Sequence, residues 1–329
     1  MGKKYKQLTI EERSQIEILL KVGKKLKEIA TILQRSQATI SRELNRNQGQ
    51  RGYRHHQAQR KADKRRFKGN PHKMTPEVKK HIDCKLIEKY SPEQITGSMQ
   101  ASLGVRVSIE SIYKYIRTDK RQAGKLYKHL RILGTKKRRK TYGKKAYRGK
   151  IPDRVDIAQR PEIVDKKERL GDWEADLVSG RHHKGFLVTL VERLTKYTLI
   201  GHVVRKESKL VTAEIIRLLK PFSHLVHTIT YDNGREFSGH SEVNKALDSQ
   251  SYFAAPYHSW DRGLNENTNG LIRQYFPKGT DLRNASLKKI KFVMDSLNNR
   301  PRKTLDFATP RDTMLLASTG LAKFQLCCT

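Results

Sequence analysis

The stretch "GFLVTLVERLTKYTLIGHVV" (185–204) decides the fold of the second half of the chain. It begins at a glycine and is rich in β-branched residues, which favours strands. "GDWEADLVSG" (171–180) has the same character, and "LVHTITYDNG" (225–234) predicts a buried strand that ends in a turn. Between them, "SKLVTAEIIRLLKPF" (208–222) predicts an amphipathic helix. Three strands followed by strand–helix alternation indicate a mixed sheet with helices on its faces.

The charge of the whole chain points to a polyanionic partner. Among 329 residues there are 69 Lys and Arg against 33 Asp and Glu, a formal net charge of +36. Such an excess repels itself unless a polyanion neutralises it, so nucleic acid is the partner we expect. The alternative is a protein that binds ribosomes or another anionic surface.

Cysteine use and hydropathy indicate the compartment. Cys84, Cys327 and Cys328 do not form a disulfide framework or a zinc-ligand pattern, which favours a reducing environment. No apolar run approaches the ~18 residues that span a membrane, and the N-terminus lacks the apolar segment of a signal peptide. We therefore expect a cytoplasmic, nucleoid-associated protein with no membrane partner.

The N-terminal residues have the spacing of a helix-turn-helix. "TIEERSQIEILLKVG" (9–23) opens with a capping box, and "KKLKEIATILQRSQATISRELNRN" (24–47) gives two more short helices around a break. Ser36 is the expected cap of the last helix. The residues expected to face DNA from that helix are Gln37, Thr39, Ser41, Arg42 and Arg46. An ordinary helical hairpin is the alternative, but the basic exit "RELNRN" favours DNA.

A second helix, glycine-containing turn and helix are predicted in "YSPEQITGSMQASLGVRVSIESIYKYI" (90–116). Further on, "TKKRRKTYGKKAYRGK" (135–150) has nine Lys or Arg and no acid, which is typical of an arm that lies along phosphates, or of a solubilising segment. The expected domains are a helix-turn-helix (1–50), a basic linker (51–89), a second helix-turn-helix-like module (90–120), a basic arm (121–165), a catalytic core (166–320) and a tail (321–329).

Three carboxylates occupy positions suited to chemistry. Asp176 lies in a strand, Asp232 ends a later strand, and Glu266 begins a helix. Acids at strand ends mark the natural site of an open α/β sheet, and carboxylate oxygens suit Mg²⁺ or Mn²⁺. Two ions would support an in-line phosphoryl displacement.

Structural roles for two of these acids stay open as alternatives. Asp232 before Asn-Gly is a common turn residue, and Glu266 is suited to stabilise a helix dipole. The rival acids are Asp172, Glu174, Glu236 and Asp261, and Asp172 and Glu174 share strand parity with Asp176.

Several stretches carry a specific resemblance: "SPEQITG" (91–97), "WEADL" (173–177), "YDNGREF" (231–237), "NENTNGLIRQYFPKGTDL" (265–282) and "LNNRPRKTLDFATP" (297–310). They are very similar to the IS-thirty (IS30) family of bacterial insertion-sequence transposases, as is the N-terminal helix-turn-helix. The resemblance covers nearly the whole chain. The departures are small: Ala175 stands where glycine is common, and Gln34 occupies the turn of the helix-turn-helix.

The resemblance implies an α/β RNase H-like core of the retroviral-integrase type, with a mixed five-stranded sheet. It implies an Asp–Asp–Glu triad at Asp176, Asp232 and Glu266, and a basic residue seven positions after the glutamate, which is Arg273. We expect Arg273 and Lys278 to contact DNA phosphate, and Asn265 and Asn269 to orient the carboxylate or touch substrate.

The implied function is metal-dependent cleavage and strand transfer at the terminal inverted repeats of a mobile element. The partners would be those repeats, target DNA, and further copies of the chain in a dimer or higher synaptic complex. A DNA-binding regulator with an inactive core and a metal nuclease that does not join strands are the alternatives.

Overall fold

The computed structural model describes residues 7–68, 73–131, 151–254 and 263–319. They fall into two compact units, residues 1–75 and 76–329, each taken by itself below. No helix among the described residues is long and apolar enough to cross a membrane.

The first unit contains the expected helix-turn-helix, in α1 (Ile10–Lys21), α2 (Leu26–Ile32) and α3 (Gln37–Asn47). The Thr9 hydroxyl and the Glu12 carboxylate form the capping box that starts α1, and the Ser36 hydroxyl accepts the Thr39 N–H at the start of α3. The helices enclose a small core that is fully shielded from solvent: Ile16, Ile29 and Ile40. Gln34 takes the left-handed conformation (φ 49°) that explains why glycine is common there.

The basic linker expected over residues 51–89 is wrong as a description of this segment. It contains α4 (His55–Lys68) and α5 (Pro76–Ile87). Helix α4 packs against α1 and α3 through the fully buried Ala58, and Glu17 of α1 accepts the His55 N–H at its first turn (2.8 Å). The exposed face of the segment carries its basic residues, and its buried face is narrow. The composition is therefore basic even though the segment is helical.

The second unit begins with a three-helix module of α5, α6 (Pro92–Leu103) and α7 (Ile109–Arg121). The helix–turn–helix pattern predicted over 90–116 is present, with a capping box at Ser91 and a left-handed Gly104 (φ 64°) ending α6. The module starts at α5 because Val78, Ile82 and Leu86, spaced four apart, are buried with the other two helices.

The expected basic arm, 121–165, also divides differently. Residues 132–150, which hold its most basic stretch, lie outside the described residues. Residues 151–165 belong to the core: Ile151 and Val164 are buried, Asp156 bridges to Phe253 in parallel, and α8 (Glu162–Lys166) precedes the sheet.

The sheet of the second unit has five strands: β1 (Asp172–Ser179), β2 (Phe186–Glu192), β3 (Thr198–Val203), β4 (Thr228–Tyr231) and β5 (Gln250–Phe253). The strand order is β3-β2-β1-β4-β5. The first three strands form an antiparallel meander, and β4 and β5 join it in parallel. This confirms the mixed five-stranded sheet and the α/β core predicted from the sequence.

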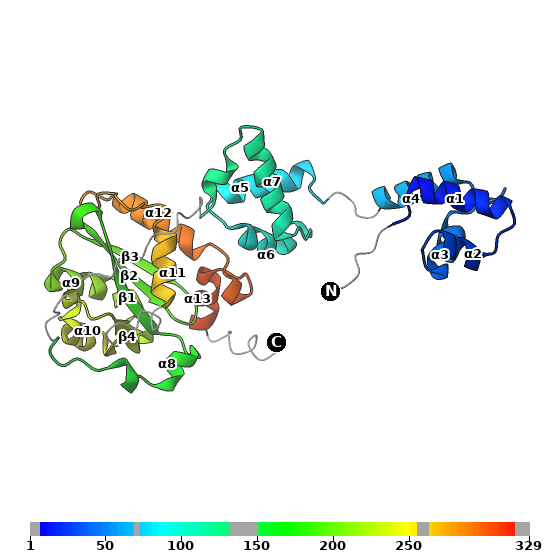
Figure 1. Ribbon diagram of the computed structural model, residues 1–329. Coiled ribbons are helices and arrows are strands. Elements are labelled where there is room, and N and C mark those ends of the chain that lie inside the picture. Colours follow the sequence, from blue (N-terminus) through cyan, green and yellow to red (C-terminus); the bar gives the residue numbers. More distant parts are fainter. Residues whose placement is uncertain (1–6, 69–72, 132–150, 255–262, 320–329) are drawn as a thin grey trace, which may run out of the picture. The chain divides into compact units, whose positions relative to one another are not determined.

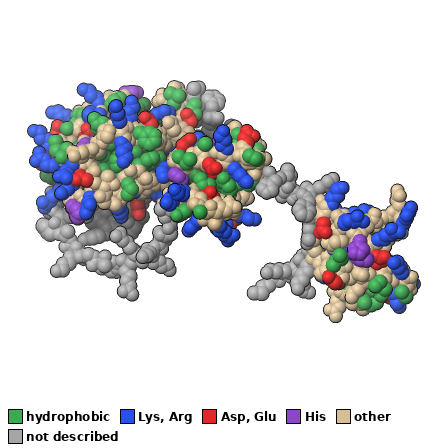
Figure 2. Space-filling view, turned by 90° about the horizontal axis from the view of Figure 1, so that it is seen from above, with side chains coloured by type: hydrophobic (Ala, Val, Ile, Leu, Met, Phe, Trp, Pro, Cys, Tyr) green, Lys and Arg blue, Asp and Glu red, His purple; other side chains and the backbone are tan. Residues whose placement is uncertain are grey.

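Helices cover both faces of the sheet (Figure 1). Helix α9 (Ser208–Leu219) packs on β2 and β3, and α10 (His240–Leu247) packs on α9 and β5, around a core that includes Trp173 and Ala175 of β1. Helices α11 (Gly263–Ile272) and α12 (Leu287–Asn298) cover the other face, with Val178 of β1 in their core. Helix α13 (Pro310–Ser318) ends the described chain. Lys and Arg side chains stud the visible surfaces of both units (Figure 2).

Candidate active site

The pairing of β1 with β4 sets the surroundings of the first two candidate carboxylates. It joins Asp172 to Thr228 and Glu174 to Thr230, and it ends before Asp176 on β1 and before Asp232, which directly follows β4. Paired strands lie about 4.8 Å apart. Asp176 belongs to the sheet face covered by α11, because it lies two residues from Val178, which packs in the core on that face.

Helix α11 brings the third carboxylate toward the same face. It packs on β1 and β2, and the Asn269 amide donates to Asp176 Oδ2 at 2.7 Å. Glu266 precedes Asn269 by three residues, so the two lie on one side of the helix. The prediction for Asn269 concerned the carboxylate of Glu266, whereas the hydrogen bond that the structure shows goes to Asp176. Asn265 is 1% exposed, which places it against the sheet and away from substrate.

The donor set fits a hard divalent cation in its chemistry. Asp176 on β1 and Asp232 directly after β4 carry carboxylate oxygens, which hard divalent cations prefer as ligands. Glu266 is exposed on the first turn of α11, and within the described residues no three His, Cys, Asp or Glu side chains are already grouped as a metal site. Asp232 also makes a turn, since its Oδ1 accepts the Gly234 N–H at 2.9 Å.

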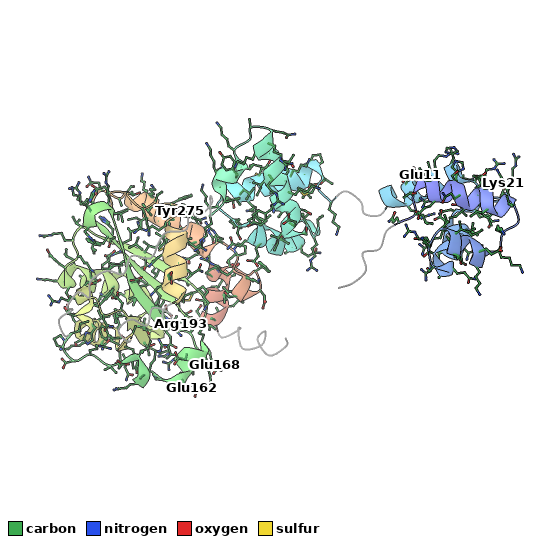
Figure 3. All side chains as sticks on the ribbon, viewed as in Figure 1. Glu11, Lys21, Glu162, Glu168, Arg193 and Tyr275 are labelled. Carbon is green, nitrogen blue, oxygen red and sulfur yellow. The ribbon has the colours of Figure 1, made fainter. Side chains whose placement is uncertain are left out.

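The rival acids on β1 have structural partners. Asp172 is fully buried and accepts two hydrogen bonds from the Arg169 guanidinium, both 3.0 Å, and one from the Thr228 hydroxyl at 2.7 Å. Glu174 is 1% exposed and forms an ion pair with Arg193. Figure 3 labels Arg193 close to α8, whose Val164 carbonyl accepts the Arg193 Nε–H at 3.0 Å.

The other rivals are placed as follows. Glu236 is buried and pairs with Lys206 at 2.9 Å, so its charge is matched within the fold. Asp261 lies outside the described residues. Of the acids near the site, Asp176 is the one on β1 whose carboxylate meets α11.

The basic residues after Glu266 divide into anchored and exposed groups. Arg273 is half-buried and donates to the Ser179 carbonyl at 2.7 Å, which ties the end of α11 to the end of β1. Burial lowers the pKa of its guanidinium from the ordinary value. Lys278 is exposed, and Arg283, also exposed, pairs with Asp281 at 2.7 Å.

Four of the five predicted DNA readers lie exposed on α3: Gln37, Ser41, Arg42 and Arg46. Gln37 and Ser41 are four residues apart, as are Arg42 and Arg46, so each pair shares a strip of the helix surface. Thr39 differs, because it is half-buried and its hydroxyl bonds the Ser36 hydroxyl at 2.8 Å.

Arg131 was not predicted to be a functional residue, yet its side chain contacts α11. Its Nη1 donates to Asn267 Oδ1 at 3.1 Å, one residue from Glu266. Arg131 lies 135 residues before Glu266, so no local sequence pattern connects the two. The feature of the sequence that could have drawn attention to Arg131 is its position at the edge of the basic arm.

This chain is similar to known proteins in sequence and in structure. A family model described as "Helix-turn-helix domain" matches residues 4–47. The integrase catalytic core of HTLV-2, solved with magnesium, matches with a TM-score of 0.34 and 18% identity, over 43% of this chain and 92% of that one. The core of BIV integrase matches with a TM-score of 0.35 and 18% identity, over 47% and 98%. The class of the protein is defined by curated relatives that match nearly the whole chain, and these are transposases.

Curated relatives specify the family. The transposase for insertion sequence element IS4351 of Bacteroides fragilis is 44% identical over 311 residues, covering 93% of this chain and 95% of that protein. The transposase InsI for IS30A of Escherichia coli K12 is 37% identical, covering 93% and 82%. The transposase for IS1086 of Cupriavidus metallidurans is 37% identical, covering 93% and 94%. This chain belongs to the IS30 family of insertion-sequence transposases, as its sequence motifs predicted.

Proposed function

We propose that this chain cuts and joins DNA at the ends of its own mobile element, with Asp176, Asp232 and Glu266 as the catalytic triad. The observation that carries the proposal is the hydrogen bond from Asn269 of α11 to Asp176 (2.7 Å). It links the helix that bears Glu266 to the strand that bears Asp176, and this strand pairs with β4, which ends immediately before Asp232. This arrangement supports the assignment of the three carboxylates to one site.

The protein's part in the reaction is to hold and orient. Asp176 and Asp232 would bind the metal from the sheet, and Glu266 would complete the site from α11 once DNA is present. The Asn269 amide keeps one Asp176 oxygen fixed. Bound Mg²⁺ or Mn²⁺, as two ions, supplies activation of the attacking oxygen and stabilisation of the leaving oxygen. Water attacks first, and the freed 3′-hydroxyl attacks a second phosphodiester, so no covalent protein–DNA bond is needed.

DNA contacts are assigned by position. Helix α3 would read the terminal inverted repeats in the major groove through Gln37, Ser41, Arg42 and Arg46, with Thr39 supporting the cap. The α5–α7 module would hold a second stretch of the same end. Lys278, which is exposed, would meet phosphate near the triad, and Arg273 would do so after exchanging a backbone carbonyl for phosphate. Two ends must be held at once, so we expect a homodimer or a higher synaptic complex.

A nicking assay tests the assignment. The full chain is incubated with Mg²⁺ and a labelled duplex that carries one end of its element, and Asp232→Asn is compared with Glu242→Gln, an exposed acid on α10. We expect Asp232→Asn to abolish nicking by at least ~10³-fold while leaving end binding unchanged, and Glu242→Gln to behave as wild type. Nicking retained by Asp232→Asn would overturn the metal assignment. Tight end binding by the wild type without nicking, in Mg²⁺ or Mn²⁺, would identify a regulator.

A further inference from the structure

Two sequence motifs that the triad does not use face each other within the second unit. "SPEQITG" (91–97) begins α6, and "LNNRPRKTLDFATP" (297–310) runs from the end of α12 into α13. Helix α6 packs against the short 3-10 turn Lys303–Leu305 of the second motif. The residues 298–308, which form the turn and its flanks, are called the docking seat below.

Hydrogen bonds to main-chain oxygens fix α6 to the docking seat. The Tyr90 hydroxyl donates to the Asn299 carbonyl at 3.1 Å, and the Gln94 Nε2 donates to the Pro301 carbonyl at 2.8 Å. The same Gln94 side chain accepts the Ser91 N–H through Oε1 at 2.9 Å, as the second half of the capping box. One amide therefore both starts the helix and attaches it to the core.

Shape complementarity accompanies these bonds. A Cβ on Gly97 would lie 2.1 Å from Cδ1 of the Phe307 ring, so the ring sits where only glycine leaves room. Asp306 and Phe307 both have positive φ (48° and 64°), a conformation that costs side-chain-bearing residues free energy and is kept where it serves a purpose. The exposed Lys303–Glu93 pair, 2.8 Å apart, adds little because solvent screens it.

The docking seat is tied in turn to the end of the catalytic helix. Arg300 is 1% exposed. It donates through Nη1 to Gln274 Oε1 at 2.8 Å and through Nη2 to the Tyr275 hydroxyl at 2.7 Å. Its guanidinium also faces the Tyr90 ring, with 6.0 Å to the ring centroid. Gln274 and Tyr275 come two and three residues after the end of α11, and Figure 3 labels Tyr275 in that region.

A second link runs from the other end of the three-helix module. The turn Leu126–His129 packs on α5 and α7, and Arg131, two residues later, donates to Asn267 of α11 at 3.1 Å. Gly270 permits this approach, since a Cβ there would lie 2.5 Å from Arg131 Nη2. Both links from the module therefore end on α11 or just after it: Asn267 is next to Glu266, and Gln274 is next to Arg273.

We propose that the docking seat fixes the position of the α5–α7 module relative to the catalytic helix. The two together would act as a molecular ruler, a rigid unit that sets the distance between bound DNA and the site of cutting. DNA held by α7 would then lie at a set distance from Glu266, and this distance would choose the phosphodiester that is cut. The ruler's effect on cutting rests on the proposed function, whereas the docking itself does not. A module on a free tether would bind ends equally well but would not fix the position of the nick.

The test compares two substitutions that change charge equally on one helix. Gln94→Glu keeps the capping acceptor, because glutamate serves at this position of a capping box, but it replaces the donor to Pro301 with an oxygen that repels the carbonyl. Gln100→Glu, at an exposed position of α6, is the matched control. In the full chain, we expect Gln94→Glu to raise amide hydrogen exchange in residues 298–308 by about tenfold, with Gln100→Glu unchanged.

On labelled element ends, Gln94→Glu should bind like Gln100→Glu but distribute its nicks over several positions, where the control nicks at one. A Gln94→Glu protein that matches the control in both exchange and nick position would overturn the proposal. Increased exchange with an unchanged nick position would support the docking contact but would contradict its role in setting the nick position. If the wild type does not nick at all, the proposed function fails, and the exchange comparison still decides whether the module is docked.

A size exchange checks the Gly97–Phe307 contact without adding charge. Gly97→Ala should raise exchange in the docking seat, since its methyl group meets the ring. Adding Phe307→Ala to that variant removes the ring and should restore protection. Absence of rescue in the double variant, with both proteins folded by circular dichroism, would contradict the contact.

Discussion

Glu174 and Asp176 lie two residues apart on the same face of β1, but their carboxylates have different surroundings. Glu174 is 1% exposed and ion-paired with Arg193, which is itself 4% exposed. Asp176 is half-buried and accepts a hydrogen bond from Asn269 of α11. One acid therefore stabilises the fold, and the other lies where a ligand can reach it.

This difference predicts opposite effects of removing the two charges. Glu174→Gln leaves the buried Arg193 charge to the exposed Asp165 carboxylate, which is 3.8 Å away, so we expect a loss of up to about 3–5 kcal/mol in stability and a fall in Tm of up to about 10 °C. Asp176→Asn removes a half-buried charge and should shift Tm by less than about 3 °C. Thermal unfolding of the two variants decides the point, and equal shifts would show that Asp176 is also a structural acid.

No reading of β1 alone could have made this distinction. Asp172, Glu174 and Asp176 share strand parity, and the partners that separate them come from Arg169, Arg193 and α11. Two of those three partners are distant in sequence. The resemblance to the IS30 family chose Asp176, and the structure adds the physical reason for excluding the other two.

Helix α4 lies in the segment that was expected to be a basic linker, and its composition explains why it was not predicted as a helix. Its sequence "HHQAQRKADKRRFK" is predominantly polar or charged, so it lacks the apolar stripe that marks an amphipathic helix. It is held by Ala58, which is fully buried, and by the Glu17 carboxylate, which accepts both the His55 N–H at 2.8 Å and the ring Nδ1 contact at 2.6 Å. In contrast, the stripe of Val78, Ile82 and Leu86 in α5 was detectable.

The Glu17 cap predicts an acid-sensitive helix. Hydrogen bonds from Lys21 and then from His55 lower the pKa of Glu17 from 4.5 to about 2. A carboxylate with a depressed pKa contributes stability above its unfolded value, and this contribution is lost as pH falls from about 4.5 through about 2. Glu17→Gln should therefore lower the amide protection of α4 at neutral pH by about fivefold or more, and the difference from wild type should vanish near pH 2.

The matched control for this experiment is Glu11→Gln, an exposed acid in the first turn of α1. It should leave the protection of α4 unchanged. Equal loss in both variants would mean that general charge, and not the cap on His55, stabilises the helix.

Helix α3 carries a prediction about sequence reading. Arg42 is exposed on α3, and Lys27 is exposed on α2, so alanine at either position removes one positive charge. If Arg42 reads a base, Arg42→Ala should weaken binding to the element's end by about 1–3 kcal/mol and leave binding to unrelated DNA nearly unchanged. Lys27→Ala should have a small effect on both. Fluorescence anisotropy on the two DNAs measures this, and a uniform loss for Arg42→Ala would mean a phosphate contact.

For the whole molecule, the order and type of the core elements were predictable because β-branched strands and amphipathic helices leave strong local patterns. Which elements touch was not predictable in this way. The bond from Asn269 to Asp176 and the contact of Gly97 with Phe307 join residues 93 and 210 positions apart. These contacts arise from packing of the complete second unit, and they connect α11 to β1 and α6 to the docking seat.

The central claim is that Asp176, Asp232 and Glu266 act as one metal site that joins DNA strands. The most direct measurement incubates the full chain with Mg²⁺ and a labelled duplex carrying both ends of its own element, and scores joined product for wild type, Glu266→Gln and Glu242→Gln. We expect joined product from wild type and Glu242→Gln, and none from Glu266→Gln at equal end binding. Joined product from Glu266→Gln at the wild-type level would contradict the claim.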